Sequence, residues 1–319
     1  MMLPTGQILG IINWFFISLA GLLYLTIFFC VLKCRRELRD IALLLTSHTC
    51  LSALFVCLIV SVMICSNLFG GFLLIDKNLC NIWGLFYDIF ECHIYYGYGL
   101  QSFYRLCRIV FYKKRKLLSL SLYLTLICSQ WFLILILLLP PIFVNWYDRL
   151  PTENYCLIPY TYIGPEVYHI LFLYLIPLIC LSIVYLWITT FMRRISKIPT
   201  LTIAAAQHVR NQRDLTVIRR ILMLVSILIV LRFPTIIFMT HGAIVGNLYP
   251  FTYGIVGITT SICLIFIAII TIYITPQVRK EILKIFLTQN NQVRTEPIPL
   301  NRINHPIHVF AKSTLTQKK

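Results

Sequence analysis

Long apolar segments alternate with short polar or basic segments along most of the chain. Each apolar segment has the roughly 20 residues that a helix needs to cross the hydrocarbon core of a bilayer. The pattern predicts an all-α membrane protein built as a seven-transmembrane helix bundle. The predicted spans are residues 8–32, 41–68, 80–110, 118–144, 167–192, 215–240 and 250–274.

The pattern changes after the seventh span. In residues 276–286, apolar and basic side chains recur on opposite faces of a helix, which predicts a short amphipathic helix on the membrane surface. The two faces consist of Val278, Ile282, Ile285 and Phe286, and of Arg279, Lys280 and Lys284. Residues 287–319 are polar and aperiodic, so we expect a disordered cytoplasmic tail there and one membrane domain over residues 1–286.

Composition and charge support a membrane location. The sequence is 59% hydrophobic and 12% charged, whereas a soluble domain has about 25% charged residues. The net charge of +17 would suit nucleic acid, but of 28 Lys and Arg all except Lys77, Arg149 and Arg232 fall on one side of the predicted topology. This asymmetry places the N-terminus outside and the C-terminus in the cytoplasm. We expect a multi-pass plasma-membrane protein whose environment is the lipid bilayer and which binds no nucleic acid.

The third span carries ionisable side chains, which are costly in hydrocarbon and therefore mark a candidate functional site. Asp88, Glu91 and Tyr95 recur at spacings of three and four, so they share one helix face. A carboxylate pair facing inward can bind a cationic ligand, although a network that only orders the bundle is the alternative. Arg232 in the sixth span and His241 near its outer end are further ligand-binding candidates.

Residues at matching offsets resemble the rhodopsin-like (class A) G-protein-coupled receptors. Cys80 begins the third span and Cys156 lies in the second outer loop, where the family has a disulfide. Arg105 lies 25 residues after Cys80, at the position of the arginine in the family's Asp/Glu-Arg-Tyr motif. Further matches are Trp131 in the fourth span, Pro177 and Tyr185 in the fifth, Pro234 in the sixth, and the run from Pro276 to Lys280.

The resemblance implies a function. Cys80 and Cys156 would form a disulfide, which an oxidising exterior favours because both lie near the outer surface. Arg105 and Tyr185 would contact a heterotrimeric G protein at the cytoplasmic face. The chain would then be a cell-surface receptor that binds an extracellular ligand, such as a neuropeptide or a small amine, and in response activates a G protein. It would catalyse no reaction and need no cofactor or metal.

The sequence also departs from the family pattern. Tyr104 stands where the acidic partner of the arginine is expected, Ser52 replaces the usual aspartate, and Arg232 replaces a tryptophan. The Asn-Pro-x-x-Tyr motif of the seventh span is absent. No lysine lies between Lys197 and Lys280, which excludes a retinal Schiff base and hence opsin function. The chain is similar to a divergent, orphan-type member.

Two other classes of protein compete with the receptor. A small transporter or channel would also place ionisable groups of the third and sixth spans along its pathway, but such folds often contain internal repeats, and none is evident here. An intramembrane enzyme would need a catalytic set of residues. His48, Cys50, His93 and His169 are scattered and form no such set.

We expect Glu91 and Arg232 to form an ion pair inside the bundle. Glu91 lies eleven residues after Cys80, about 16 Å along the helix. Arg232 lies ten residues before Gly242, about 15 Å from the outer end of its span. A lone charge at that depth costs about 2.5–3.5 kcal/mol. The alternatives are pairing of Arg232 with Asp88, or extension of Arg232 toward water.

A charge-swap cycle of Glu91→Arg, Arg232→Glu and the double variant tests the pair through expression and ligand response. The double variant should recover what the single variants lose. Two impaired single variants whose losses simply add in the double variant, with no coupling energy, would exclude the pair.

Overall fold

The structure is a computed structural model that describes residues 5–33, 40–150, 153–196, 226, 229, 233–249 and 251–293. The chain divides into two compact units, residues 1–280 and residues 281–319. Apart from the part of α9 after Lys280, all described helices and strands belong to the first unit.

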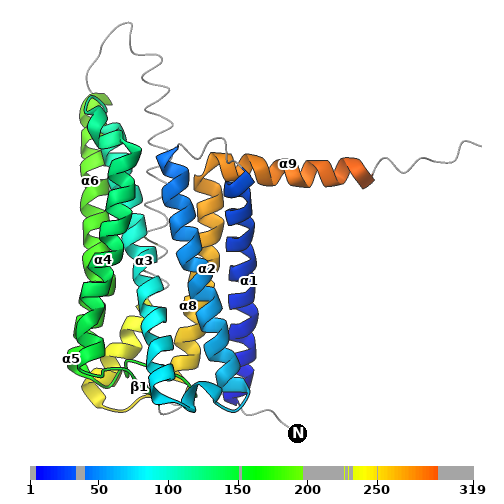
Figure 1. The fold of residues 1–319 in the computed structure, drawn as a ribbon, viewed down its shortest axis with the longest axis vertical. Coiled ribbons are helices and arrows are strands. Elements are labelled where there is room, and N and C mark those ends of the chain that lie inside the picture. Colours follow the sequence, from blue (N-terminus) through cyan, green and yellow to red (C-terminus); the bar gives the residue numbers. More distant parts are fainter. Residues whose placement is uncertain are drawn as a thin grey trace, which may run out of the picture. The chain divides into compact units, whose positions relative to one another are not determined.

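Helices dominate the described residues (Figure 1). The long helices are α1 (Thr5–Lys33), α2 (Ile41–Leu68), α3 (Lys77–Ile109), α4 (Leu120–Phe143), α6 (Ile176–Ser196), α8 (Thr252–Ile274) and α9 (Pro276–Val293). The shorter elements are η2 (Phe72–Leu74), η3 (Arg115–Leu118), β1 (Asp148–Arg149), β2 (Cys156–Leu157), α5 (Ile163–His169) and η4 (Ile170–Leu175). A further apolar helix covers Phe233–Val245.

Five helical segments within the described residues are long and apolar enough to cross a membrane. They are α1, α2, α4, the continuous segment formed by α5, η4 and α6, and α8. The helix Phe233–Val245 lies in the sixth predicted span, most of which falls outside the described residues. α3 is not among the five, because Asp88, Glu91, His93 and several tyrosines give it a lower mean hydropathy. The chain is a multi-pass membrane protein.

Side-chain caps set the first residue of α2 and of α3. The carboxylate of Asp40 accepts a hydrogen bond from the backbone N–H of Ala42 at the start of α2. Asp76 does the same for Asn78 at the start of α3. An uncapped first turn leaves backbone donors unsatisfied, so a capping residue fixes where a helix begins. For this reason α3 begins at Lys77, three residues before the predicted start at Cys80.

The fifth span contains a local change of helix type. It begins at Ile163 rather than at the predicted residue 167, and residues Ile170–Leu175 form a π-helix between α5 and α6. Pro177 follows these wider turns directly and has no N–H to donate to the preceding turn of the helix. Wider π turns of this kind occur frequently at functional sites.

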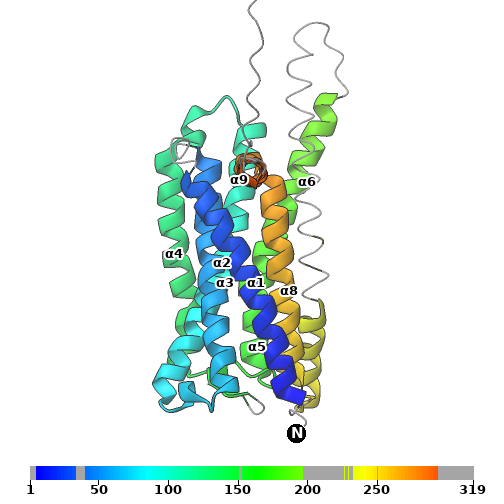
Figure 2. The ribbon, with the colours of Figure 1, turned by 90° about the vertical axis from the view of Figure 1, so that its right-hand side faces the viewer.

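α3 packs against several other elements of the first unit (Figure 1 and Figure 2). It contacts α2, α4, α6, η4 and β2, while α1 packs against α2 and α8. One apolar cluster joins α3, α4 and η4 through Ile89, Cys92, Ile134, Leu138 and Leu173. α3 therefore holds the bundle together from within.

Residues 145–162 between α4 and α5 are called the lid here; positions 151 and 152 lie outside the described residues. β1 and β2 form an antiparallel hairpin in the lid, with Arg149 opposite Cys156. A disulfide joins Cys156 to Cys80 in the first turn of α3, with the two Cα atoms 5.3 Å apart. The disulfide implied by the sequence is present, and it fastens the lid to α3.

α9 differs from the predicted amphipathic helix in length. The prediction ended the helix at Phe286, whereas α9 continues to Val293. No glycine or proline interrupts residues 277–293, and Lys284 pairs with Glu281 one turn before it at 2.5 Å. Residues 287–293, which the prediction placed in the tail, thus belong to α9, and residues 294–319 lie outside the described part of the chain.

The contact between α3 and the lid predicts the effect of a small substitution at Gly84. A Cβ at this position would lie 2.8 Å from the carbonyl oxygen of Cys156 and 2.9 Å from the ring of Tyr147. Gly84→Ala should lower the free energy of unfolding by about 1–3 kcal/mol, the usual cost of overpacking, seen as a lower thermal midpoint of the purified protein.

Gly99→Ala in the same helix is the matched control. A Cβ at Gly99 would meet nothing within 4 Å, and alanine favours a helix by about 1 kcal/mol over glycine. Equal thermal midpoints for the two variants would show that the lid does not press against Gly84.

Candidate functional site

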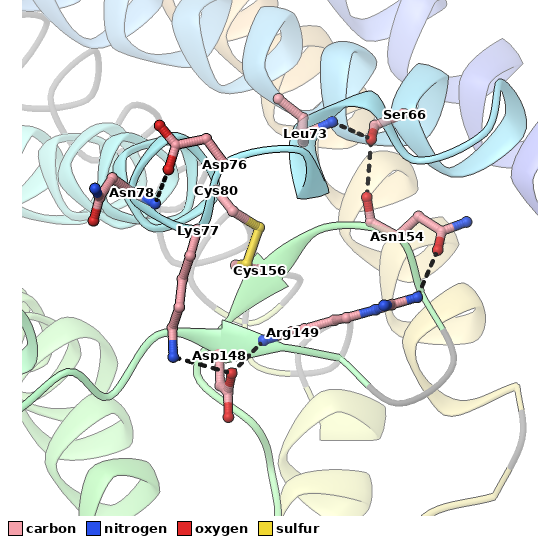
Figure 3. The surroundings of a disulfide bond; sticks show 10 residues. All are labelled: Ser66, Leu73, Asp76, Lys77, Asn78, Cys80, Asp148, Arg149, Asn154 and Cys156. Carbon is pink, nitrogen blue, oxygen red and sulfur yellow. Dashed lines mark hydrogen bonds and ion pairs between the residues drawn. A yellow bond between two sulfur atoms is a disulfide. The ribbon is translucent and has the colours of Figure 1, made fainter.

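Hydrogen bonds support the disulfide in fastening the lid (Figure 3). The hydroxyl of Ser66 at the end of α2 donates to the carbonyl oxygen of Asn154 at 2.9 Å, and accepts from the backbone N–H of Leu73 at 3.1 Å. In Figure 3, Cys80 and Cys156 lie between these contacts and the ion pair of Lys77 with Asp148. The lid is therefore held to both α2 and α3.

A cavity lies beneath the lid and is called the lid cavity. Its volume is about 90 Å³, which holds several water molecules but is smaller than the cavities of about 300–1,000 Å³ that enclose drug-sized ligands. α1, α2, α3, the lid, α5, the helix Phe233–Val245 and α8 all contribute to its walls. The polar side chains lining it include Asn13, Tyr87, Asp88, Glu91, Tyr155, Tyr160, His169, Thr235, Tyr253 and Thr260.

Asp88 connects α3 to the lid. The phenol of Tyr147 donates a 2.7 Å hydrogen bond to Oδ2 of Asp88, and the two residues are only 2% and 1% exposed, respectively. The other oxygen of Asp88, Oδ1, is buried and has no hydrogen-bond partner among the described residues. The buried carboxyl group therefore has one oxygen still available to a ligand.

Glu91 and Tyr95 lie deeper on the same helix face. The phenol of Tyr95 donates to Oε1 of Glu91 at 3.4 Å. Glu91 lines the lid cavity, and both residues line a second small cavity together with His169 and Tyr174. The structure therefore brings Asp88, Glu91 and Tyr95 to connected positions on one face of α3, at the spacing read from the sequence.

Of the two other predicted ligand residues, the structure describes only His241, which is not part of this group. The ring of His241 stacks on Tyr249, with centroids 5.4 Å apart, and His241 lines neither of the two cavities. Arg232 lies outside the described residues. Its pairing with Glu91 stays a prediction.

Sequence reasoning missed the contribution of α5 to the site. His169 was counted only among scattered histidines, yet ligand atoms of Asp88, Glu91 and His169 all lie within 4.8 Å of one another. Glu166, one turn earlier, is 2% exposed. The signal was available, because Glu166 and His169 are spaced i, i+3 in an apolar span, as are Asp88 and Glu91.

His93, one of the scattered histidines of the sequence, is completely buried. Its ring lies against Trp131, with centroids 3.7 Å apart, and its Nδ1 is 3.1 Å from the side-chain nitrogen of Gln130. This pairing fastens α3 to α4 away from the lid cavity.

The opposite end of α3 carries Arg105. Its guanidinium Nη1 donates to the hydroxyl of Tyr185 on α6 at 3.2 Å. Both residues line a small inner cavity with Tyr98, Gln101 and Thr271. The hydroxyl groups of Tyr98 and Thr271 are 3.3 Å apart, which connects α3 to α8 at the same level.

Tyr104 stands at the position of the missing acid. It is 9% exposed and packs edge-on against Tyr123 of α4, with ring centroids 5.3 Å apart. The side chain of Tyr104 therefore packs against α4. The guanidinium of Arg105 donates its hydrogen bond to the hydroxyl of Tyr185 instead.

Neither a family model nor a curated protein matches the sequence. Among solved structures, the crystal structure of squid rhodopsin is similar, with a TM-score of 0.74, 14% sequence identity and coverage of 94% of each chain. This similarity shows the fold. The chain has the seven-transmembrane fold of rhodopsin-like G-protein-coupled receptors, and the fold class predicted from the sequence is confirmed.

The attachment of the lid to α2 predicts a dependence on pH. The side-chain amide of Asn67 donates to the carboxyl group of Glu153. Burial raises the pKa of Glu153 to about 7 from the ordinary 4.5, although the bond from Asn67 lowers it in part. Because the folded-state pKa is raised, the stability that Glu153 contributes is full below pH 4.5 and is lost as pH rises through about 7.

We therefore expect the thermal midpoint to fall between pH 5.5 and pH 8 by more in the wild-type protein than in Glu153→Gln. The difference between the two proteins removes the effect of all other titrating groups. An identical fall in both proteins would contradict the raised pKa of Glu153.

Proposed function

We propose that the protein is a cell-surface receptor that binds an extracellular ligand in the lid cavity and activates a heterotrimeric G protein at the opposite end of the bundle. The observation that carries the proposal is that one helix, α3, reaches both places. Asp88 and Glu91 line the lid cavity, and Arg105 lines the inner cavity. Asp88 and Arg105 are 17 residues apart, about 25 Å along the helix.

The chemistry of the lid cavity favours a cationic ligand. Two carboxyl groups of α3 line it, and an amine or the basic side chain of a peptide would neutralise them. The volume of about 90 Å³ admits a single side chain or a small amine group in this arrangement. A peptide would therefore rest its remaining residues on the lid and insert one basic group.

The coupling follows from the inner contacts. The bond between Arg105 and Tyr185 holds α3 to α6. A ligand that prefers an arrangement with these helices apart would shift the population toward it. The inner ends of the helices would then be accessible to the G protein, with the protein in the plasma membrane, its N-terminus outside and its C-terminus in the cytoplasm.

A screen tests the proposal directly. Cells expressing the chain are exposed to peptide and amine libraries, and G-protein dissociation is recorded. Asp88→Asn should weaken the response to any active ligand by about tenfold or more, because it removes a charge-assisted contact. Ligand-dependent ion currents or uptake without G-protein dissociation would favour a channel or transporter instead.

The inner contacts predict the effect of a substitution at Arg105. Arg105→Ala should reduce G-protein activation by about tenfold or more, since contacts to a charged group are worth about 1.5–3 kcal/mol, while surface expression stays intact. Activation is read as nucleotide exchange on the G protein in membranes with matched receptor amounts.

Arg108→Ala is the matched control, because Arg108 lies one turn further along α3 and is exposed, whereas Arg105 is half-buried and bonded to Tyr185. Normal signalling by Arg105→Ala would make Arg105 a membrane anchor only.

A further inference from the structure

We propose that Asp88, Glu91 and His169 bind a divalent metal ion of the zinc type beneath the lid, and that this ion joins α3 to α5. Each of the three side chains offers one ligand atom, and these atoms all lie within 4.8 Å of one another. All three residues line the lid cavity. The inference goes beyond the proposed receptor function, because binding of the ion requires no G protein. The ion would compete with a cationic ligand for the two carboxyl groups of α3.

Buried oxygens without partners support a cation site. Oδ1 of Asp88 has no hydrogen-bond partner among the described residues, and neither has either carboxyl oxygen of Glu166. Asp88 is 1% exposed and Glu166 is 2% exposed, and their carboxyl groups interact electrostatically. Leaving such oxygens unsatisfied away from water is costly, and a metal ion bound to Asp88 would remove that cost at Asp88.

The backbone presents the ligands from two facing elements. Asp88 and Glu91 lie one turn apart on α3, and Glu166 and His169 lie one turn apart on α5. Side chains spaced i, i+3 share a helix face, and metal sites inside helix bundles are built from such inward pairs. The π-helix begins directly after His169, at the point where π turns often mark a site.

The types of ligand select the ion. Carboxylates alone would suit Ca²⁺ or Mg²⁺, but an imidazole ligand favours zinc and related transition metals. Zinc bonds of about 2.0–2.2 Å place two ligand atoms at most about 4.4 Å apart, so small side-chain rotations complete the site. Three protein ligands leave a fourth position that faces the cavity, which has room for water or for a group of a second ligand.

Two tyrosines already orient the carboxyl groups. Tyr147 donates to Oδ2 of Asp88, the oxygen opposite the one without a partner, and Tyr95 donates to Oε1 of Glu91. Ligating carboxylates in metal sites are commonly held by such outer hydrogen bonds. A carboxylate has two oxygens and about four lone-pair positions, so a further contact of Glu91 is compatible with metal ligation.

The test uses the full-length protein in lipid nanodiscs and measures thermal unfolding with Zn²⁺, Ca²⁺ or Mg²⁺, together with competition against a chromophoric zinc chelator. Saturating Zn²⁺ should raise the thermal midpoint by about 5 °C or more, and Ca²⁺ or Mg²⁺ should not. Asp88→Asn, Glu91→Gln and His169→Gln should each weaken Zn²⁺ binding by about tenfold or more.

The matched controls are His48→Gln and Asp148→Asn. His48 contacts His93 and Trp131 and lines neither small cavity, and Asp148 lies in β1 of the lid. Both variants should bind Zn²⁺ as the wild-type protein does. Binding that persists in His169→Gln or Glu91→Gln, or an equal effect of Ca²⁺, would overturn the proposal.

Co²⁺ spectra of the wild-type protein decide the question if a variant fails to fold. Bands typical of nitrogen and oxygen ligands would support the site. Thiolate bands would overturn it, because the ion would then be held by cysteines, and the absence of any Co²⁺ or Zn²⁺ binding would overturn it as well.

Discussion

The arrangement of the bundle depends on the polar side chains of α3, because each of them needs a hydrogen-bond partner inside the protein. Within hydrocarbon a polar group must find its partner inside the protein, so each of these side chains requires a neighbouring element at its own level. Their partners lie in the lid, α4, α8 and α2. The pairs are Asp88 with Tyr147, His93 with Gln130, Tyr98 with Thr271, and Gln101 with Thr49. Together they fix which elements surround α3.

The lid extends this constraint beyond the helices. The disulfide of Cys80 and Cys156 brings the hairpin onto α3, and Gly84 leaves room for the ring of Tyr147 against the helix. Tyr147 then reaches Asp88 inside the bundle. A ligand that takes over this carboxyl group must replace a hydrogen bond worth about 1.5–3 kcal/mol if Asp88 is ionised. In the proposed receptor, the lid would therefore take part in ligand selection as well as cover the cavity.

The sequence was sufficient to predict those features of the fold that repeat with a regular period along the chain. Apolar length placed the spans, and the spacing of Asp88 and Glu91 placed both on one inward face. It was insufficient where residues distant in the chain meet. The i, i+3 spacing of Glu166 and His169 indicates a shared helix face, but the approach of His169 to within 4.8 Å of the carboxyl groups of α3 depends on how α5 packs before the π-helix. The hydrogen bond of Tyr147 to Asp88 likewise depends on how the lid folds onto α3.

The inner end of α3 is connected to its neighbours without an acidic residue next to Arg105. The residue before Arg105 is Tyr104, which packs against Tyr123, so no adjacent acidic residue restrains the guanidinium of Arg105. The hydrogen bond of Arg105 with Tyr185 holds α3 to α6. A hydrogen bond to a charged group is worth about 1.5–3 kcal/mol, which corresponds to about a ten- to hundredfold change in an equilibrium constant. A ligand would offset the bond of Arg105 with Tyr185 if it bound about ten- to hundredfold more tightly to an arrangement in which α3 and α6 are apart. α3 also carries the carboxyl groups of the lid cavity. In the proposed receptor, a ligand bound to these groups would therefore act directly on the helix that must separate from α6.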